Sequence, residues 1–245
     1  MKNLANKTYW KSLEFKSLKQ IMNIEFSELF YRYLRTDKKN SQKTMLEIGC
    51  SPARFLAYIA KYFHYYPEGI DYLSGSKLIC EETLRNMGVH DFKIFEEDFL
   101  AWRFKKKYDL VCSFGFIEHF SNPEIVIRKH ISVTKKSGIV IIGIPNFGGW
   151  QKLLHSKLDK NDFLRHNISI MNLDYFDYIC RKYNIKKLYS NYYGGLFDFW
   201  WNNKNPSPIQ RIAYIILRII ATAVGKLKLN NKYLSPYIIF IGRVS

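Results

Sequence analysis

Acidic side chains lie in or at the ends of successive strand-like runs in the first half of the chain. Glu47 lies in the first run, Asp71 closes the second in PEGIDYL, and Asp98 closes the third in FKIFEEDFL. A carboxylate at the end of the second strand is placed to accept hydrogen bonds from both hydroxyls of a ribose. Asp98, followed by the apolar Phe99, suits an exocyclic amine beside a stacking ring. Together these residues predict a nucleoside-binding edge of an α/β sheet.

The turn after the first run, GCSPA at 49–53, resembles a Gly-x-Gly-x-Gly ligand loop. Gly49 keeps the first glycine, whereas Ser51 and Ala53 replace the second and third. Glycines at such a turn let the backbone approach a ligand, and Ser51 would cost about 1 kcal/mol if its φ were positive. The single methyl of Ala53 keeps close packing of the next helix available. The loop is a working ligand-binding loop, one that has lost its ligand, or a coincidental match to the pattern.

The fourth run, YDLVCSF, leads into the pair Glu118-His119. Histidine has an unperturbed pKa near 6.5, so His119 is a candidate general base. Glu118 would then orient it, or the two would ligate a divalent metal. His166, in FLRHNISIMN, is a second candidate base. The alternatives are a structural hydrogen bond for His119, and helix capping or surface display for His166.

Strand-like and helix-like segments alternate along most of the chain, which is typical of a parallel sheet flanked by helices. The predicted strands are 44–49, 67–72, 92–97, 108–114, 137–144, 185–192 and 237–244, and the predicted helices are 53–64, 74–87, 122–135, 172–183 and 208–225. The fold class is therefore α/β: a doubly wound, mostly parallel seven-stranded sheet whose last strand is antiparallel.

Segments outside this alternation define the expected organisation. Residues 8–36 show helical spacing of apolar positions, followed by the polar linker TDKKNSQK. We expect an N-terminal helical cap at 1–43, a main domain at 44–245, and substrate-side insertions within 146–236, before the last strand.

The order and spacing of these features over residues 44–145 resemble the class I S-adenosylmethionine-dependent methyltransferases, whose fold is Rossmann-like. The resemblance implies S-adenosylmethionine as cofactor, with Glu47 and Gly49 near its methionine part, Asp71 at the ribose, Asp98 at the adenine amine and Phe99 along the ring. The cofactor-binding set it implies is Glu47, Gly49, Cys50, Ser51, Ala53, Asp71, Tyr72, Asp98, Phe99 and Ser113. The catalytic set is His119, Glu118 and His166, and no metal site is assigned.

The sequence indicates the methyl acceptor less directly than it indicates the cofactor. The Asp/Asn-Pro-Pro-aromatic motif of enzymes that methylate nucleic-acid amines is absent. At that position, the end of the fourth run, the chain reads SFGFIEH. The aromatic and polar stretches at 145–172 and GGLFDFWW suit a sugar, and 145–245 looks like a subgroup from bacterial surface-polysaccharide biosynthesis. This resemblance implies O-methylation of a nucleotide-linked or lipid-linked sugar, with a phosphate as an optional feature. The alternatives are an RNA-directed methyltransferase and a non-catalytic, methyltransferase-like partner protein.

Charge is uneven, with a formal net charge of +17 and, from residue 199 onward, seven Lys or Arg and no Asp or Glu. Such a field favours anionic partners, although solvated lysines explain it equally well. The apolar segment 208–225 carries Arg211 and Arg218 on one face and falls short of the ~20 residues that span a bilayer. It would lie on an acidic membrane face, or form a core or homodimer helix that covers the sheet.

Cellular location is expected to be the cytoplasm, with peripheral contact at the inner membrane face as an option. The four cysteines are scattered singly, which argues against a zinc or disulfide framework and fits a reducing cytosol. The first residues, MKNLANKTYWKS, have no apolar run of the signal-peptide kind.

Overall fold

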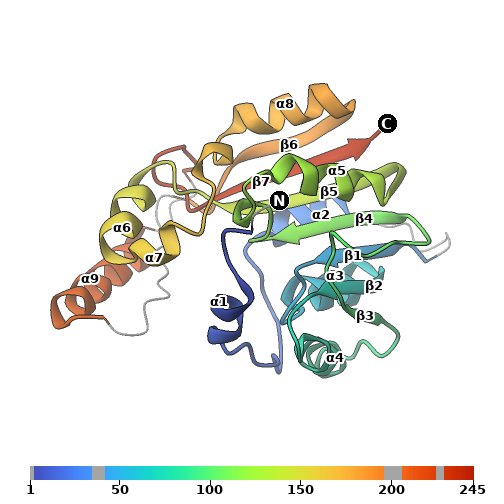
Figure 1. The fold of residues 1–245 in the computed structure, drawn as a ribbon, viewed down its shortest axis with the longest axis horizontal. Helices are drawn as coiled ribbons and strands as arrows, with labels where there is room; N and C mark the ends of the chain where they lie inside the picture. Colours follow the sequence, from blue (N-terminus) through green and yellow to red (C-terminus); the bar gives the residue numbers. More distant parts are fainter. Residues whose placement is uncertain (1–2, 35–41, 196–205, 225–228) are drawn as a thin grey trace.

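A seven-stranded sheet in the order β3-β2-β1-β4-β5-β7-β6 forms the centre of the computed structural model, which describes residues 3–34, 42–195, 206–224 and 229–245 (Figure 1). β1 to β5 are parallel, and β7 runs antiparallel between β5 and β6. The predicted fold class is confirmed. The strands are β1 Thr44–Ile48, β2 Tyr66–Asp71, β3 Lys93–Glu96, β4 Tyr108–Phe114, β5 Thr134–Pro145, β6 Ile185–Tyr193 and β7 Tyr237–Val244.

Both faces of the sheet are buried, which explains why its central strands read as continuous apolar runs. In β5, Ile139 and Ile141 enter one core, while Val140 and Ile142 enter the other. This alternation follows from the two-residue period of a strand. Full burial of each such side chain contributes about 1.5–3 kcal/mol.

Helices cover the two faces in separate sets, and the two cores record which side each one takes. Residues of α2, α3 and α4 join the first core, and residues of α5 and α8 join the second. The helices are α1 Lys7–Ser12, α2 Ser27–Tyr33, α3 Arg54–Phe63, α4 Ser76–Asn86, α5 Pro123–Ser132, α6 Trp150–Leu158, α7 Lys160–Phe163, α8 Leu173–Tyr183 and α9 Pro208–Val224, with short 3-10 turns η1 Ile117–His119 and η2 Ile168–Ile170.

The helical spacing over 8–36 corresponds to two short helices and not to one continuous helix. Only α1 and α2 form, and Glu14, just after α1, has a positive φ of 51°. Between these helices two backbone N–H groups find partners on α4 or just after it: that of Leu18 donates to Thr83 Oγ1 at 3.0 Å, and that of Ile21 contacts Met87 Sδ at 3.1 Å. Most of the linker 36–43 lies outside the described residues, and the boundary at 43 stays a prediction.

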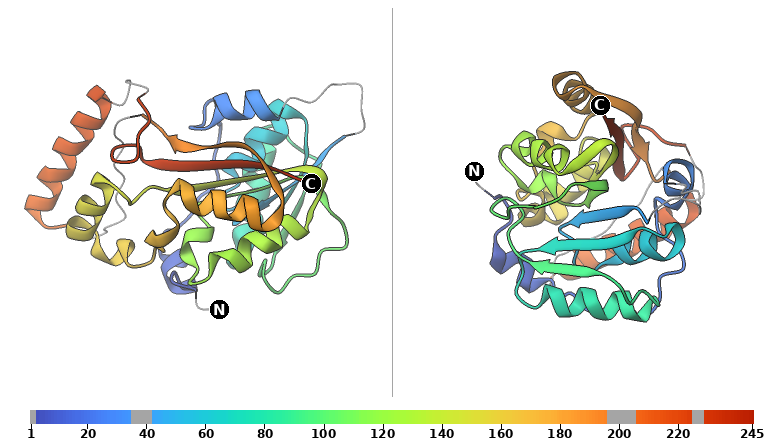
Figure 2. Two further views of the ribbon diagram at one scale, coloured as in Figure 1. Left: turned by 90° about the horizontal axis from the view of Figure 1, so that it is seen from above. Right: turned by 90° about the vertical axis from the view of Figure 1, so that its right-hand side faces the viewer.

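The carboxyl ends of the parallel strands point toward α1, α6 and α7, as the arrowhead of β4 shows in Figure 1. The sequence did not predict α6 and α7. In Figure 2, α9 lies beyond them at the far end of the molecule rather than over the sheet. Within the described part of the chain, no helix has the length and apolar character needed to cross a membrane.

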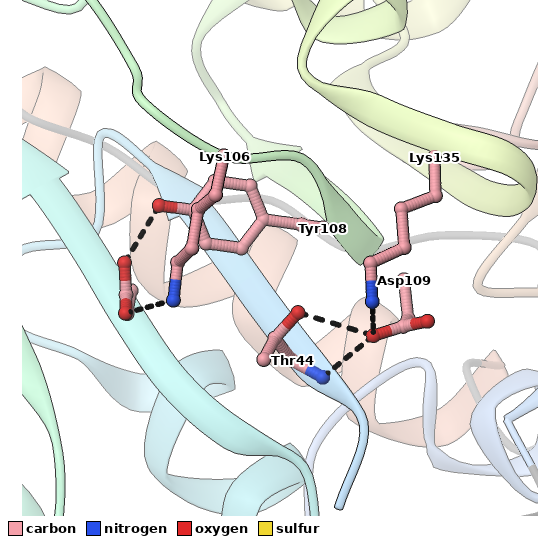
Figure 3. Close-up of polar contacts among 6 residues, drawn as sticks. Thr44, Lys106, Tyr108, Asp109 and Lys135 are labelled. Atoms are coloured by element: carbon pink, nitrogen blue, oxygen red, sulfur yellow. Dashed lines mark hydrogen bonds and ion pairs between the residues drawn. The ribbon is translucent and has the colours of Figure 1, made fainter.

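The opposite, amino edge of the sheet is held by two polar clusters (Figure 3). The buried carboxylate of Glu68 accepts hydrogen bonds from Lys106 Nζ and from the Tyr108 hydroxyl, both at 2.6 Å. Asp109 accepts from the backbone N–H of Thr44 at 2.9 Å and from Lys135 Nζ at 2.8 Å. Charge-assisted bonds of this kind fix the starts of β1, β2 and β4 relative to one another.

Removing one of these bonds should weaken the fold without touching the carboxyl edge. Tyr108→Phe keeps the buried ring but removes a donor from the Glu68 carboxylate, so we expect the free energy of unfolding to fall by about 1–3 kcal/mol. Urea unfolding at an unchanged m-value measures this loss. An unchanged urea midpoint would contradict the importance of this bond.

Candidate active site

A cavity of about 390 Å³ opens at the carboxyl ends of β1, β2 and β4. Its size falls in the range of about 300–1,000 Å³ typical of small-molecule sites. Of the residues predicted from sequence, those that line it are Gly49, Ser51, Asp71, Tyr72, Asp98, Phe99 and His119. Residues far apart in the chain are therefore brought to one site, as expected for a doubly wound sheet.

The loop 49–53 approaches this cavity closely at Gly49. Its φ is +68°, and a Cβ there would lie 2.7 Å from Cδ2 of Phe116, a ring that lines the cavity. Ser51 does not have a positive φ; Ala53 has one, at 68°, just before α3. The backbone strain that a missing glycine causes therefore falls on Ala53, at about 1–2 kcal/mol. The loop therefore retains its glycine at position 49, where no larger residue fits.

Asp71 is held in one orientation at the end of β2. Its two carboxylate oxygens accept from the backbone N–H groups of Ser51 at 3.1 Å and of Leu73 at 3.0 Å. Burial raises the pKa of Asp71, whereas these bonds act in the opposite direction. Beyond β3, Asp98 Oδ1 accepts from Leu100 N at 2.8 Å. The next residue, Phe99, is buried and places its ring at the cavity wall.

Four of the predicted cofactor residues are buried and line neither this cavity nor the second one described below: Glu47, Cys50, Ala53 and Ser113. Ser113 Oγ bonds to His130 Nε2 at 3.0 Å. Glu47 lies in β1, where burial raises its pKa strongly and Oε2 has no hydrogen-bond partner among the described residues.

A second cavity, of about 290 Å³, adjoins the first, and the two share the lining residues Trp10, Leu13, Phe114, Gly115 and His119. All three predicted catalytic residues line it: Glu118, His119 and His166. A molecule held in this cavity would therefore lie next to one held in the first. The arrangement is that of two adjacent substrate pockets.

The histidines in the second cavity are fixed through their Nδ1 atoms. His119 Nδ1 bonds to the backbone oxygen of Arg165 at 3.0 Å, and His166 Nδ1 to that of Asp162 at 2.8 Å. A carbonyl accepts, so both Nδ1 atoms carry hydrogen and both Nε2 atoms carry lone pairs. Burial, together with His166, lowers the pKa of His119 to about 3. It is therefore neutral at physiological pH.

Glu118 is fully buried beside His119, with Oε1 3.9 Å from His119 Nε2. Neither carboxylate oxygen has a hydrogen-bond partner within the described ranges of the chain. Burial raises the pKa of Glu118 to about 8, whereas the nearby backbone N–H groups of Glu118 and Phe116 act in the opposite direction.

Sequence reasoning missed most of the N-terminal contribution. Asn3, Trp10, Leu13 and Phe15 line the first cavity. The segment is tied down by hydrogen bonds from Leu4 N to His119 O at 2.7 Å and from the Tyr9 hydroxyl to Asp162 Oδ1 at 2.6 Å. Tyr9 and Trp10 are conspicuous aromatic residues of the N-terminus, but no local pattern indicates that they fold over a sheet edge.

The second cavity also contains polar residues that sequence reasoning missed. Arg54, at the start of α3, pairs with Glu25 at 2.9 Å, and both line the cavity together with Asp162. The four-residue spacing of Asp162 and His166 was the only local feature of the sequence that could have pointed to these cavity residues. Of the stretch GGLFDFWW, predicted to surround the mouth, residues 196–201 lie outside the described residues.

Comparisons with known proteins agree with this geometry. The sequence profile of a family described as "Methyltransferase domain" matches residues 22–189. A comparison with curated protein sequences finds no relative.

Several solved structures share the fold. A SAM-dependent methyltransferase from Archaeoglobus fulgidus superposes with a TM-score of 0.59 at 14% identity, covering 97% of this chain and 100% of that one. The magnesium protoporphyrin IX methyltransferase of Synechocystis, solved with bound SAH, gives 0.55 at 10% identity, covering 89% and 78%. The MccD protein gives 0.63 at 12% identity, covering 91% and 100%.

The chain belongs to the family of methyltransferase domains, because the profile matches most of its length. The predicted class of enzyme is thus confirmed. The expected methyl donor, S-adenosylmethionine, is that of solved relatives with the same fold, and the residues present fit it. Asp71 would hold the ribose, and the bare Gly49 leaves room for close approach of the ligand.

Gly49 and Gly75 allow a matched test of the cradle. Both have a positive φ, but a Cβ at Gly75 meets nothing within 4 Å. Ala at either position carries similar backbone strain, whereas only Gly49→Ala displaces Phe116. We expect Gly49→Ala to weaken binding of S-adenosylhomocysteine (SAH), the product form of the cofactor, by about tenfold or more, equivalent to ~1.4 kcal/mol. Gly75→Ala should change the affinity much less. Calorimetric titration measures both, and equal losses would contradict the role of Gly49.

Proposed function

We propose that this enzyme methylates a hydroxyl oxygen of a sugar or of a nucleotide-linked or lipid-linked sugar, in the synthesis of a bacterial surface polysaccharide. The observation that carries the proposal is the second cavity, which adjoins the cofactor pocket at His119. The Asp/Asn-Pro-Pro-aromatic motif of nucleic-acid amine methylation is missing after β4.

The lining of the second cavity combines aromatic rings with polar groups. Trp10, Phe26, Phe55 and Tyr237 supply rings on which the C–H faces of a sugar can stack. Glu25, Arg54, Asp162 and His166 supply hydrogen-bonding groups around them. A few polar groups on an apolar wall are what orients a small ligand. Arg54 adds a guanidinium that suits a phosphate-bearing acceptor, with its charge balanced by Glu25 when no acceptor is bound.

His119 is placed to take the proton of the acceptor hydroxyl. Bound S-adenosylmethionine supplies a methyl group on a positively charged sulfur. A hydroxyl group whose oxygen is being methylated is a far stronger acid than an imidazolium. Even the weakly basic His119 would therefore accept its proton at Nε2. The shared wall would also align the cofactor and the acceptor, and this alignment would account for the remaining rate enhancement.

His119 is therefore expected to serve catalysis and not cofactor affinity. His119→Ala should reduce turnover by roughly 100-fold or more, the usual contribution of a general base, while the dissociation constant for SAH stays within about threefold. His90→Ala, at an exposed surface position, is the control. Transfer of a labelled methyl group to a panel of sugar nucleotides and lipid-linked sugars measures turnover.

RNA in the same panel tests the second candidate, which the net charge of +17 motivates. Methylation of RNA, with binding that weakens steeply as salt rises, would overturn the sugar proposal. SAH binding with near wild-type turnover in His119→Ala would instead assign His119 to structure.

We also propose that α9 lies on the surface of an anionic membrane, which fits a lipid-linked acceptor. The prediction of a core helix that covers the sheet is wrong, whereas that of a homodimer helix stays a prediction. Six isoleucines of this helix are 45–79% exposed: Ile209, Ile212, Ile215, Ile216, Ile219 and Ile220. Arg211 and Arg218 are exposed on the flank of this stripe, and the helix has no acidic residue. An apolar stripe flanked by cations is typical of interfacial helices.

The membrane proposal predicts sedimentation of the protein with phosphatidylglycerol vesicles but much less with phosphatidylcholine vesicles. The pair Ile212→Glu and Ile219→Glu should reduce the bound fraction by about tenfold, because apolar burial and anionic attraction are both lost. Leu78→Glu, at an exposed apolar position on α4, is the matched control. Equal binding to both vesicles, or a dimer without lipid that the double substitution dissociates, would contradict the proposal.

A further inference from the structure

The cluster of the buried Glu118 and His119 with the half-buried His166 has the composition and spacing of a metal site. One potential ligand atom from each residue lies within 4.8 Å of the others. Two imidazoles and one carboxylate match the three-ligand sets that hold catalytic zinc and leave one position open. The open side would face the second cavity, which all three residues line.

The imidazole nitrogens are already arranged for this role. In each histidine, Nδ1–H donates to a backbone carbonyl, of Arg165 or of Asp162, which leaves Nε2 as the lone-pair atom. Metal-binding histidines commonly show this hydrogen bond on the ring nitrogen that does not bind the metal, because it fixes the tautomer and the ring plane.

Glu118 supplies an independent observation. Its side chain is completely buried, yet neither oxygen accepts a hydrogen bond of good geometry from the described residues, although the backbone N–H groups of Glu118 and Phe116 lie near it. A buried polar group without a partner costs about 1–3 kcal/mol, so native proteins rarely retain one without a reason. A cation between Glu118 and the two histidines would supply the missing partner.

We propose that Glu118, His119 and His166 bind a divalent transition-metal ion of the zinc class. Magnesium and calcium prefer oxygen ligands, whereas imidazole suits zinc and its neighbours. With the ion bound, Nε2 of His119 would be a ligand and would no longer accept the proton directly. The ion would hold the acceptor hydroxyl and lower its pKa, and the hydroxyl proton would leave to solvent water during transfer. This catalytic role rests on the proposed function, but binding of the ion does not.

Cobalt is the probe, because Co²⁺ replaces zinc and gives visible absorption bands that report its ligands. We expect the chelator-treated protein to bind one equivalent of Co²⁺, and Glu118→Gln and His166→Gln each to weaken binding by roughly 100-fold. His155→Gln is the control, since His155 is not one of the proposed ligands and belongs with Asp159 and Asp162 to a neighbouring buried group. SAH affinity within threefold of wild type shows that each variant is folded.

Absence of Co²⁺ binding in protein that still binds SAH would overturn the inference, as would loss of binding only in His155→Gln. Chelator-resistant methyl transfer would overturn the catalytic role of the ion. Co²⁺ binding without transfer to any hydroxyl acceptor would contradict the proposed function while supporting the metal site.

Discussion

The turn from Phe116 to Phe120 is pinned by backbone hydrogen bonds from two remote segments, and both cavities depend on it. Leu4 N donates to His119 O, and Asn167 N donates to Glu118 O, each at 2.7 Å. The turn follows β4 directly, so the sheet fixes one end while these bonds fix the other. A turn held in this way keeps His119 at the wall between the two pockets.

The sheet itself could be predicted from sequence because its strands leave unambiguous patterns. β4 and β5 read as apolar runs since both their faces are buried, and Asp71 and Asp98 follow strand ends whose positions were correct to within a residue or two. Parallel strands end at one edge, so placing these carboxylates near one another required no long-range information.

Long-range contacts explain what the sequence did not predict. The segment between α1 and α2 keeps helical spacing, but two of its backbone N–H groups find partners on α4 or just after it, a contact that no local pattern encodes. Similarly, His166 meets His119 only because the chain returns after α6 and α7. The positive φ at Ala53, rather than Ser51, depends on how the loop enters α3, which residue types alone did not reveal.

The central claim is that the loop 49–53 and Asp71 form a working cofactor pocket, and calorimetric titration with SAH tests it most directly. Wild-type protein should bind with micromolar affinity, and Asp71→Asn should bind at least about tenfold more weakly while unfolding at a similar temperature. Asparagine keeps the size of the side chain but replaces one of the two accepting oxygens with a donor. No binding by folded wild-type protein would contradict the account and favour a non-catalytic, methyltransferase-like partner protein.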